Sequence, residues 1–108
     1  MKKTGLLILC TAMIVATPVS AQATGDPAKG QKKNSMCAGC HGIPDWRTAY
    51  PEVYSVPKLG GQHAAYIIKA LQAYKSGARN HPTMKAIAAS LTDQDMADLA
   101  AYYSGGGK

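Results

Sequence analysis

Two cysteines stand three positions apart in the chain, Cys37 and Cys40, and a histidine, His41, follows the second directly. This C-x-x-C-H pattern is typical of covalent attachment of a c-type haem. Two thiols one helical turn apart can add to the two vinyl groups on one edge of a porphyrin, and the next residue then directs an imidazole toward the iron. The small residues between the cysteines, Ala38 and Gly39, allow the backbone to lie close to the ring. The motif therefore predicts a domain that folds around a haem.

Three other interpretations of the motif have less support. A zinc site needs four ligands, and the chain has no second C-x-x-C pair and no H-x-H pair to complete one. A thioredoxin-like dithiol stands within a βαβ pattern, whose strand signals are missing here. A disulfide between the two cysteines would close a very short loop and add little stability, although an oxidising compartment would permit one.

The start of the chain has the features of a cleaved secretory signal. Lys2 and Lys3 give a basic start, residues 6–16 form an apolar run broken only by a threonine, and residues 21–23 read A-x-A. The apolar run is shorter than the roughly 18 residues that a membrane span requires. We predict a signal peptide over residues 1–23, a single domain over residues 24–108, no membrane span in the mature protein, and a periplasmic location. An uncleaved anchor is the alternative.

The chain is short and basic. Its 108 residues allow one small domain, and 12 Lys and Arg against 6 Asp and Glu give a formal net charge of +6. Without Lys2 and Lys3, ten basic residues face six acidic ones, which leaves +4. An exported domain without an arginine-rich stripe is a poor partner for nucleic acid. We expect the basic residues before and after the motif to form a positive ring that steers redox partners with acidic docking surfaces, although a solvated face is the plain alternative. These residues are Lys29, Lys32, Lys33, Lys58, Lys69, Lys75, Arg79 and Lys85.

Three segments have the pattern of helices, and the predicted fold class is all-α. Asp26 and Pro27 mark the start of the first helix, which is only weakly amphipathic and contains Gly30, a candidate for a close helix crossing. The second begins at Ala64, has apolar residues at a period of 3.6 and stops at Gly77.

The third predicted helix opens at Thr92 with Asp95 three residues later, a variant of the capping box, and Met96 belongs to its apolar stripe. Three short helices without a phenylalanine supply little core for a domain of about 85 residues. A haem would fill that gap, with the helices packed around it.

The chain also resembles a known family. The resemblance lies in segments that cover nearly all of the predicted domain: residues 25–30, residues 37–42, residues 57–63, and Met84 followed by residues 91–102. They are similar to class I c-type cytochromes of the small soluble bacterial kind, and most of all to one half of the tandem dihaem cytochromes. The resemblance implies three main helices around one covalent haem c, with the first and last crossing beside it. It also implies one-electron transfer between larger redox complexes and no enzymatic activity.

The resemblance assigns roles to individual residues. Cys37 and Cys40 would form the thioether links, and His41 would be the proximal iron ligand. The carbonyl of Pro57 would accept a hydrogen bond from the His41 imidazole and so orient it, although Pro57 could be a plain turn residue. Met84 matches the second axial ligand of the family.

Two features depart from the family pattern. Asn34 stands where many relatives have an aromatic packing residue, and the loop over residues 43–56 is longer than in close relatives. That loop carries three aromatic residues, Trp46, Tyr50 and Tyr54. They could donate hydrogen bonds to haem propionates or pack over the haem edge, and we expect packing for at least two of them.

From the residues alone, five side chains are candidates for the sixth iron ligand: Met36, Met84, Met96, His63 and His81. Met36 adjoins the attachment cysteines and cannot readily reach the opposite face of a haem. Met96 is expected in the core, and His63, at the start of a helix, is expected to cap that helix or to lie at the surface.

The remaining candidates, His81 and Met84, lie in a segment that we expect to be a loop, opened by Asn80 and stiffened by Pro82. A methionine thioether raises the reduction potential, whereas a second imidazole would lower it. The resemblance favours Met84, so we predict a closed iron with His41 and Met84 as axial ligands.

Two functions fit these features. The first is a diffusible electron carrier, and the alternative is a haem c electron-relay subunit bound to a specific dehydrogenase. The sequence does not separate them, because a free carrier and a bound subunit share the same haem chemistry. An enzyme with an open haem site is a weaker third interpretation.

Overall fold

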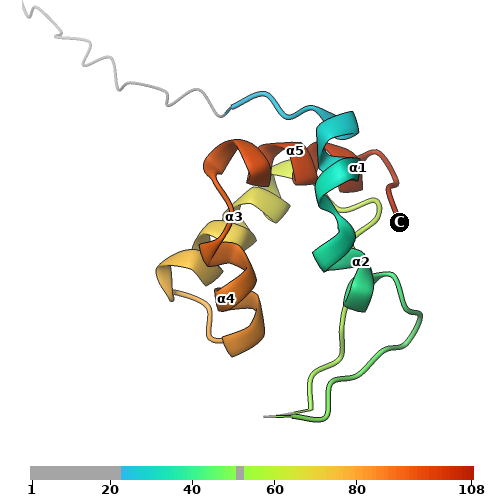
Figure 1. The fold of residues 1–108 in the computed structure, drawn as a ribbon, viewed down its shortest axis with the longest axis vertical. Helices are drawn as coiled ribbons and strands as arrows, with labels where there is room; N and C mark the ends of the chain where they lie inside the picture. The colour runs from blue at the N-terminus through green and yellow to red at the C-terminus, as the bar shows by residue number, and fades with distance from the viewer. Residues whose placement is uncertain (1–22, 51–52) are drawn as a thin grey trace, which may run out of the picture.

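The computed structural model describes residues 23–50 and 53–108, and over these ranges the chain is helical (Figure 1). Five helices follow one another: α1 (Pro27–Lys33), α2 (Ser35–His41), α3 (Ala64–Ser76), α4 (Pro82–Ala89) and α5 (Asp93–Ser104). The only β pairing in these ranges is an isolated bridge between Arg47 and Ser55, so the all-α prediction is confirmed. No helix of the described part of the chain is long and apolar enough to cross a membrane. The predicted signal peptide lies outside the described residues, except for Ala23.

The structure has five helices where three were predicted. The first predicted helix is divided at Asn34, so that α1 ends at Lys33 and the C-x-x-C-H motif lies on a separate short helix, α2. The prediction of a loop around Met84 is wrong, because this residue lies in α4. Pro82 begins α4 instead of stiffening a loop, since its fixed φ suits the first helical position, and His81 is the N-cap.

Helix α1 packs across α5, which brings the first and last helices of the described residues together (Figure 1). The predicted start of α1 is confirmed, because the Asp26 side chain accepts hydrogen bonds from the backbone N–H groups of Ala28 and Lys29. Gly30 is buried against the backbone of Asp98 on α5, which confirms the predicted close crossing. Because α2 follows α1 directly, this contact also fixes the position of α2 and of its C-x-x-C-H motif relative to α5.

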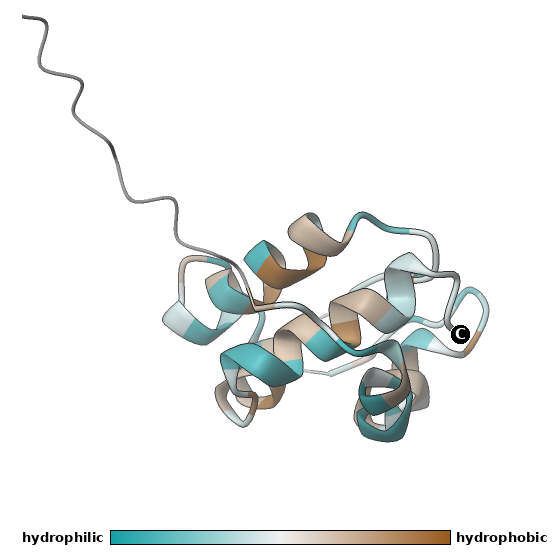
Figure 2. Ribbon diagram, turned by 90° about the horizontal axis from the view of Figure 1, so that it is seen from above, coloured by the Kyte–Doolittle hydropathy of each residue, from teal (hydrophilic) through white to brown (hydrophobic). Residues whose placement is uncertain are grey.

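The other two predicted helices are confirmed as α3 and α5. Helix α3 ends at Gly77, which adopts the left-handed conformation with φ of 86°. Helix α5 opens with the capping box of Thr92 and Asp95. Figure 2 shows hydrophobic and hydrophilic residues alternating along the helical ribbons, as in amphipathic helices. The buried apolar side chains form one small core, which consists of Ile67, Leu71, Leu91, Met96, Leu99, Ala100 and Tyr103.

Candidate haem site

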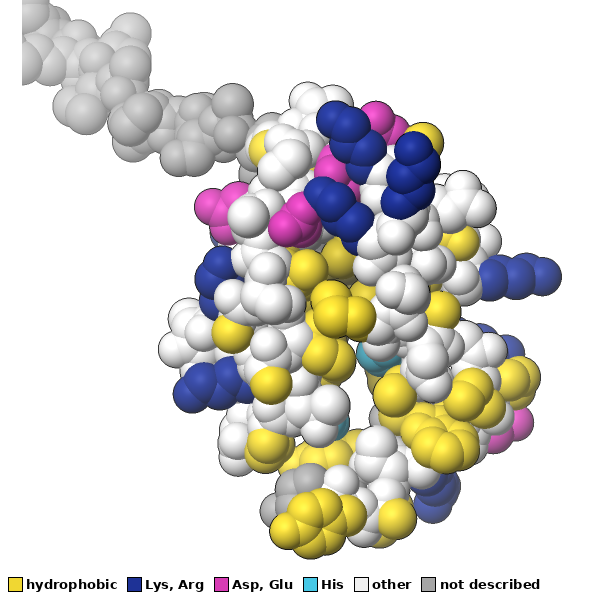
Figure 3. Space-filling view, viewed as in Figure 1, with side chains coloured by type: hydrophobic (Ala, Val, Ile, Leu, Met, Phe, Trp, Pro, Cys, Tyr) yellow, Lys and Arg dark blue, Asp and Glu magenta, His cyan; other side chains and the backbone are white. Residues whose placement is uncertain are grey.

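A cavity of about 580 Å³ lies between α2 on one side and α3 and α4 on the other, with side chains of α5 also in its wall. Figure 3 shows its opening as a hollow bordered by hydrophobic side chains. Four apolar residues of α3, α4 and α5 contribute to the wall: Ile67, Leu71, Ile87 and Leu99. The volume is in the range of about 300–1,000 Å³ that is usual for sites of small molecules and cofactors.

Helix α2 presents the C-x-x-C-H motif to this cavity. Cys37, Cys40 and His41 all line it, and both cysteines are half-buried free thiols and not the disulfide considered above. Residues three apart share one face of a helix, so both sulfur atoms come from the same side of α2. Burial raises the pKa of the Cys37 thiol. Two thiols side by side on one wall match what attachment to one porphyrin edge requires.

The imidazole of His41 is oriented by the backbone. Its Nδ1 lies 2.6 Å from the carbonyl oxygen of Pro57. A carbonyl oxygen only accepts, so Nδ1 donates its proton and Nε2 keeps the lone pair that can bind a metal. Such a hydrogen bond fixes the ring and raises its basicity. No group of three or more His, Cys, Asp and Glu side chains that could hold a metal ion occurs among residues 23–50 and 53–108, so the zinc interpretation finds no ligand set there.

Met84 lies in the first turn of α4 and lines the cavity on the side opposite α2. It is half-buried and packs against the core, and His81 lines the cavity nearby. The other candidate ligands are placed differently. Met96 is fully buried in the core, His63 is an exposed residue at the start of α3, and Met36 lines the cavity from α2, the helix of the motif.

Four side chains in contact form what we term the aromatic row. The ring centre of His81 lies 4.1 Å from that of Tyr54 and 6.2 Å from that of Tyr74, which meets it edge-on at 80°. The Arg79 guanidinium lies 4.6 Å from the Tyr74 ring centre, a cation–π contact. All four residues line the cavity. The aromatic row connects the loop over residues 43–56 with α3 and with the start of α4.

The three aromatic residues of that loop do not share one environment. Tyr54 lines the cavity and contacts His81. Trp46 is 42% exposed and Tyr50 is 89% exposed, and neither lines the cavity. Of the three expected haem-edge contacts, the structure brings only Tyr54 to the site.

Two further observations bear on the fit of a haem. The charged residues that line the cavity are Lys58 and Arg79, and no described Asp or Glu lines it, which suits a group that carries two carboxylates. Tyr103 is 2% exposed, and its buried hydroxyl meets no hydrogen-bond partner among the described residues. Burial raises the pKa of this hydroxyl above its ordinary range, so the group stays protonated. The thiols, the oriented imidazole, the apolar walls and the cations together fit a haem.

Two residues of the site were not predicted as such: Tyr74 and Tyr103. Tyr74 and Tyr103 belong to the apolar stripes of α3 and α5, which predict burial but not whether the buried face meets the core or a cavity. The sequence predicts positive charge at Arg79 but gives no signal of its contact with Tyr74.

Comparison with known proteins identifies the family. Residues 27–104 match the family described as cytochrome c. The chain belongs to the cytochrome c family. Its cofactor is therefore a covalently bound haem c, and one haem fits the single C-x-x-C-H motif at Cys37, Cys40 and His41.

Individual cytochromes match over most of the chain. Cytochrome c-554(548) of Halomonas halodenitrificans is 42% identical in an alignment of 83 residues that covers 74% of this chain and 95% of that protein. Cytochrome c4 of Pseudomonas aeruginosa is 40% identical over 84 residues, 78% of this chain and 40% of that protein. The crystal structure of reduced recombinant cytochrome c4 from Pseudomonas stutzeri matches with a TM-score of 0.61 and 32% identity, over 77% of this chain and 46% of that one. The chain thus spans less than half the length of cytochrome c4, in agreement with its resemblance to one half of a dihaem cytochrome.

Proposed function

We propose that this cytochrome c is an exported, periplasmic one-electron carrier whose iron is held by His41 and Met84. One observation carries the proposal: two side chains that can bind iron line the same cavity from α2 and α4, on opposite sides of it. When bound, haem c supplies a one-electron ferric/ferrous couple.

The residues of the site have separate tasks in this proposal. Cys37 and Cys40 hold the haem covalently, which prevents its loss from so small a core. His41 offers Nε2 to the iron because its Nδ1 is bonded to the Pro57 carbonyl at 2.6 Å. A methionine thioether from Met84 stabilises the reduced state and raises the reduction potential. The apolar walls keep water away from the iron and favour the same redox state.

We propose no catalytic activity. With side chains of the protein on both axial positions, no position remains for a substrate or for oxygen. An electron carrier needs only a small change of structure between its two redox states. Iron ligands that come from two helices favour such a small change.

The proposed partners are redox proteins with acidic docking surfaces. Lys58 and Arg79 line the cavity and no described Asp or Glu does, while Asp45 and Arg47 line a second, neighbouring pocket together with Lys58. Asp26, Asp95 and Asp98 are engaged at the contact of α1 with α5, where they cap helices or bind Lys33. The cavity side of the protein therefore offers positive charge, which would raise the rate of encounter with an acidic partner.

Replacement of the proposed ligand tests the proposal. In M84A the ferric protein should lose the sulfur-to-iron charge-transfer band and bind cyanide, and the reduced protein should bind carbon monoxide. The matched control is M36A, which removes a methionine from the same cavity on the α2 side and should leave the band unchanged. A band that survives in M84A, or that is missing from the wild type, would overturn the assignment of Met84.

Export and free diffusion need their own test. Fractionation of cells that produce the full chain should place the haem-stained protein in the periplasm, shortened by about 23 residues at its N-terminus. Native size-exclusion chromatography should then give a small monomeric species. Co-elution with a dehydrogenase would overturn the free carrier and favour the alternative, a relay subunit.

A further inference from the structure

Among the described residues, two helices have a histidine as their N-cap residue, and only one of these side chains makes a capping hydrogen bond. His63 precedes α3, is exposed, and makes no capping hydrogen bond with its side chain. His81 precedes α4, and its Nδ1 accepts a hydrogen bond from the backbone N–H of Met84 at 3.3 Å. The usual N-cap residues are Ser, Thr, Asp and Asn, which makes a capping histidine uncommon. The capping bond at His81 is therefore specific to the helix that carries Met84.

The ring of His81 is itself held in place. The Tyr54 ring lies against it with a centre distance of 4.1 Å and a tilt of 37°, and the Tyr74 ring meets it edge-on at 6.2 Å. These two tyrosines come from the loop over residues 43–56 and from α3, so two separate elements restrict rotation of the imidazole. The contacts keep Nδ1 directed at the first turn of α4.

We infer that His81 is a positioning residue for Met84: its Nδ1 caps α4 at the N–H of Met84, and the aromatic row holds the cap in place. The inference rests on the proposed role of Met84 as iron ligand. Met84 is the third residue of α4, and its N–H is among those that have no partner within the helix. The first turn of α4 is thus tied at the residue that carries the ligand. Without this bond, the turn would open more often and take Met84 with it.

Binding of an external ligand measures this opening. Cyanide reaches the iron only where Met84 has moved away, so its apparent affinity is proportional to the open fraction. Loss of an N-cap bond of ordinary strength raises that fraction about fivefold. A residue that stabilises the fold as a whole, without acting on Met84, would change the unfolding midpoint but not this affinity under native conditions.

The experiment compares cyanide affinity of the ferric holoprotein in the wild type and four variants. H81F keeps an aromatic ring in the row but cannot accept the Met84 N–H, and H81A removes both contacts. H81N restores an acceptor at the N-cap without the ring. H63A makes a matched change at the exposed histidine. We expect H81F and H81A to bind cyanide about fivefold more tightly with a weaker sulfur-to-iron band, and H81N and H63A to stay within about twofold of the wild type.

Two results would overturn the inference. One is wild-type cyanide affinity in H81F, whatever happens to its unfolding midpoint, and the other is an H63A affinity that changes as much as that of H81F. The decision does not depend on H81A, which loses the most contacts. If the wild type lacks the sulfur-to-iron band, the proposed function fails together with the inference. If the band is present and H81F has wild-type affinity, only the role of His81 fails.

Discussion

Gly30 on α1 lies so close to Asp98 on α5 that a Cβ atom at position 30 would stand 2.1 Å from the Asp98 carbonyl oxygen. Real Cβ atoms do not approach backbone oxygen that closely, so any side chain would push the two helices apart. We predict that G30A lowers the free energy of unfolding by about 3 kcal/mol, at the upper end of overpacking effects. Denaturant unfolding of the holoprotein measures the difference.

The control for this prediction is G105A. Gly105 has a negative φ of −81°, and a Cβ there would meet only ordinary contacts at 3.5 Å or more. This variant should stay within about 1 kcal/mol of the wild type, because the same change meets no backbone clash. Equal losses in G30A and G105A would mean that helix packing at position 30 is not the cause.

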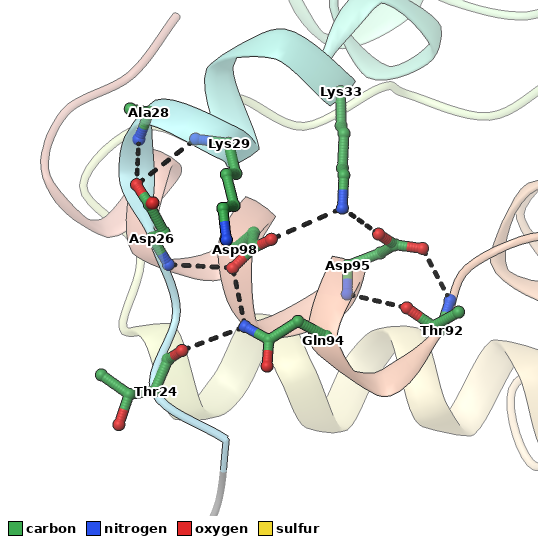
Figure 4. Close-up of polar contacts among 9 residues, drawn as sticks. All are labelled: Thr24, Asp26, Ala28, Lys29, Lys33, Thr92, Gln94, Asp95 and Asp98. Carbon is green, nitrogen blue, oxygen red and sulfur yellow. Dashed lines mark hydrogen bonds and ion pairs between the residues drawn. The ribbon is translucent and has the colours of Figure 1, made fainter.

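Asp98 is the centre of a polar network that joins the segment just before α1 to α5 (Figure 4). It is fully buried, and it accepts hydrogen bonds from the Asp26 backbone N–H at 2.9 Å and from Gln94 at 2.8 Å. Lys33 lies 3.4 Å from its second oxygen and also binds Asp95. The Asp26 N–H, Gln94 and Lys33 lower the pKa of Asp98, and the bond from Lys33 and the capping contacts with Thr92 lower that of Asp95 to about 2.

These shifts predict how stability depends on pH. Both carboxyl groups have a lower pKa in the folded state than the ordinary 3.8, so their contribution is present above that pH and is lost as the pH falls through the folded pKa, which is about 2 for Asp95. D98N should therefore be less stable than the wild type by about 2 kcal/mol near neutral pH, because it breaks charged hydrogen bonds in a buried site. The difference should shrink progressively as the pH falls below 3.8. Unfolding midpoints measured across this range give the result.

D93N is the matched variant for the acid prediction. Asp93 is an exposed carboxylate in the first turn of the same helix, so its loss removes one charge near the same helix terminus. Its effect should be below about 1 kcal/mol, the size of an exposed charge–dipole contact. If D98N and D93N give the same pH profile, the network around Asp98 does not cause the acid sensitivity.

The parts of the fold that could be predicted are those with local signals. The apolar period of α3 and the capping box of Thr92 and Asp95 each lie within a few residues, and both were found. Helix α4 lacks such a local signal, because a proline fits a loop as well as a first helical position and because a histidine is not a usual N-cap residue. The aromatic row could not be predicted, since Tyr54 and His81 meet only after distant segments have packed. Within the site, the attachment motif could be predicted from the sequence. Most of the other residues that line the cavity could not, because distant segments bring them together.

The buried hydroxyl of Tyr103 gives a third prediction. It meets no hydrogen-bond partner among the described residues, and an unpaired buried polar group costs about 1–3 kcal/mol. If this hydroxyl also stays unpaired beside the haem, Y103F should leave the free energy of unfolding of the holoprotein unchanged or raise it by about 1 kcal/mol. Y102F is the control, because the neighbouring Tyr102 hydroxyl donates to the Lys108 carbonyl at 3.1 Å. That variant should lose about 0.5–1 kcal/mol, and a larger loss in Y103F than in Y102F would contradict the prediction.

The last prediction concerns the charge at the cavity. Lys58 is exposed and lines the cavity, whereas Lys32 is exposed on α1 and does not, so K58E and K32E change the net charge equally at two different places. If acidic partners dock at the cavity side, K58E should slow electron transfer to an acidic redox protein about tenfold at low ionic strength, and added salt should narrow the difference from the wild type. K32E should have a much smaller effect, because its charge lies farther from the docking surface. Stopped-flow rates at several salt concentrations measure both variants. Equal slowing by the two would mean that only net charge matters, and rates independent of salt would exclude electrostatic steering.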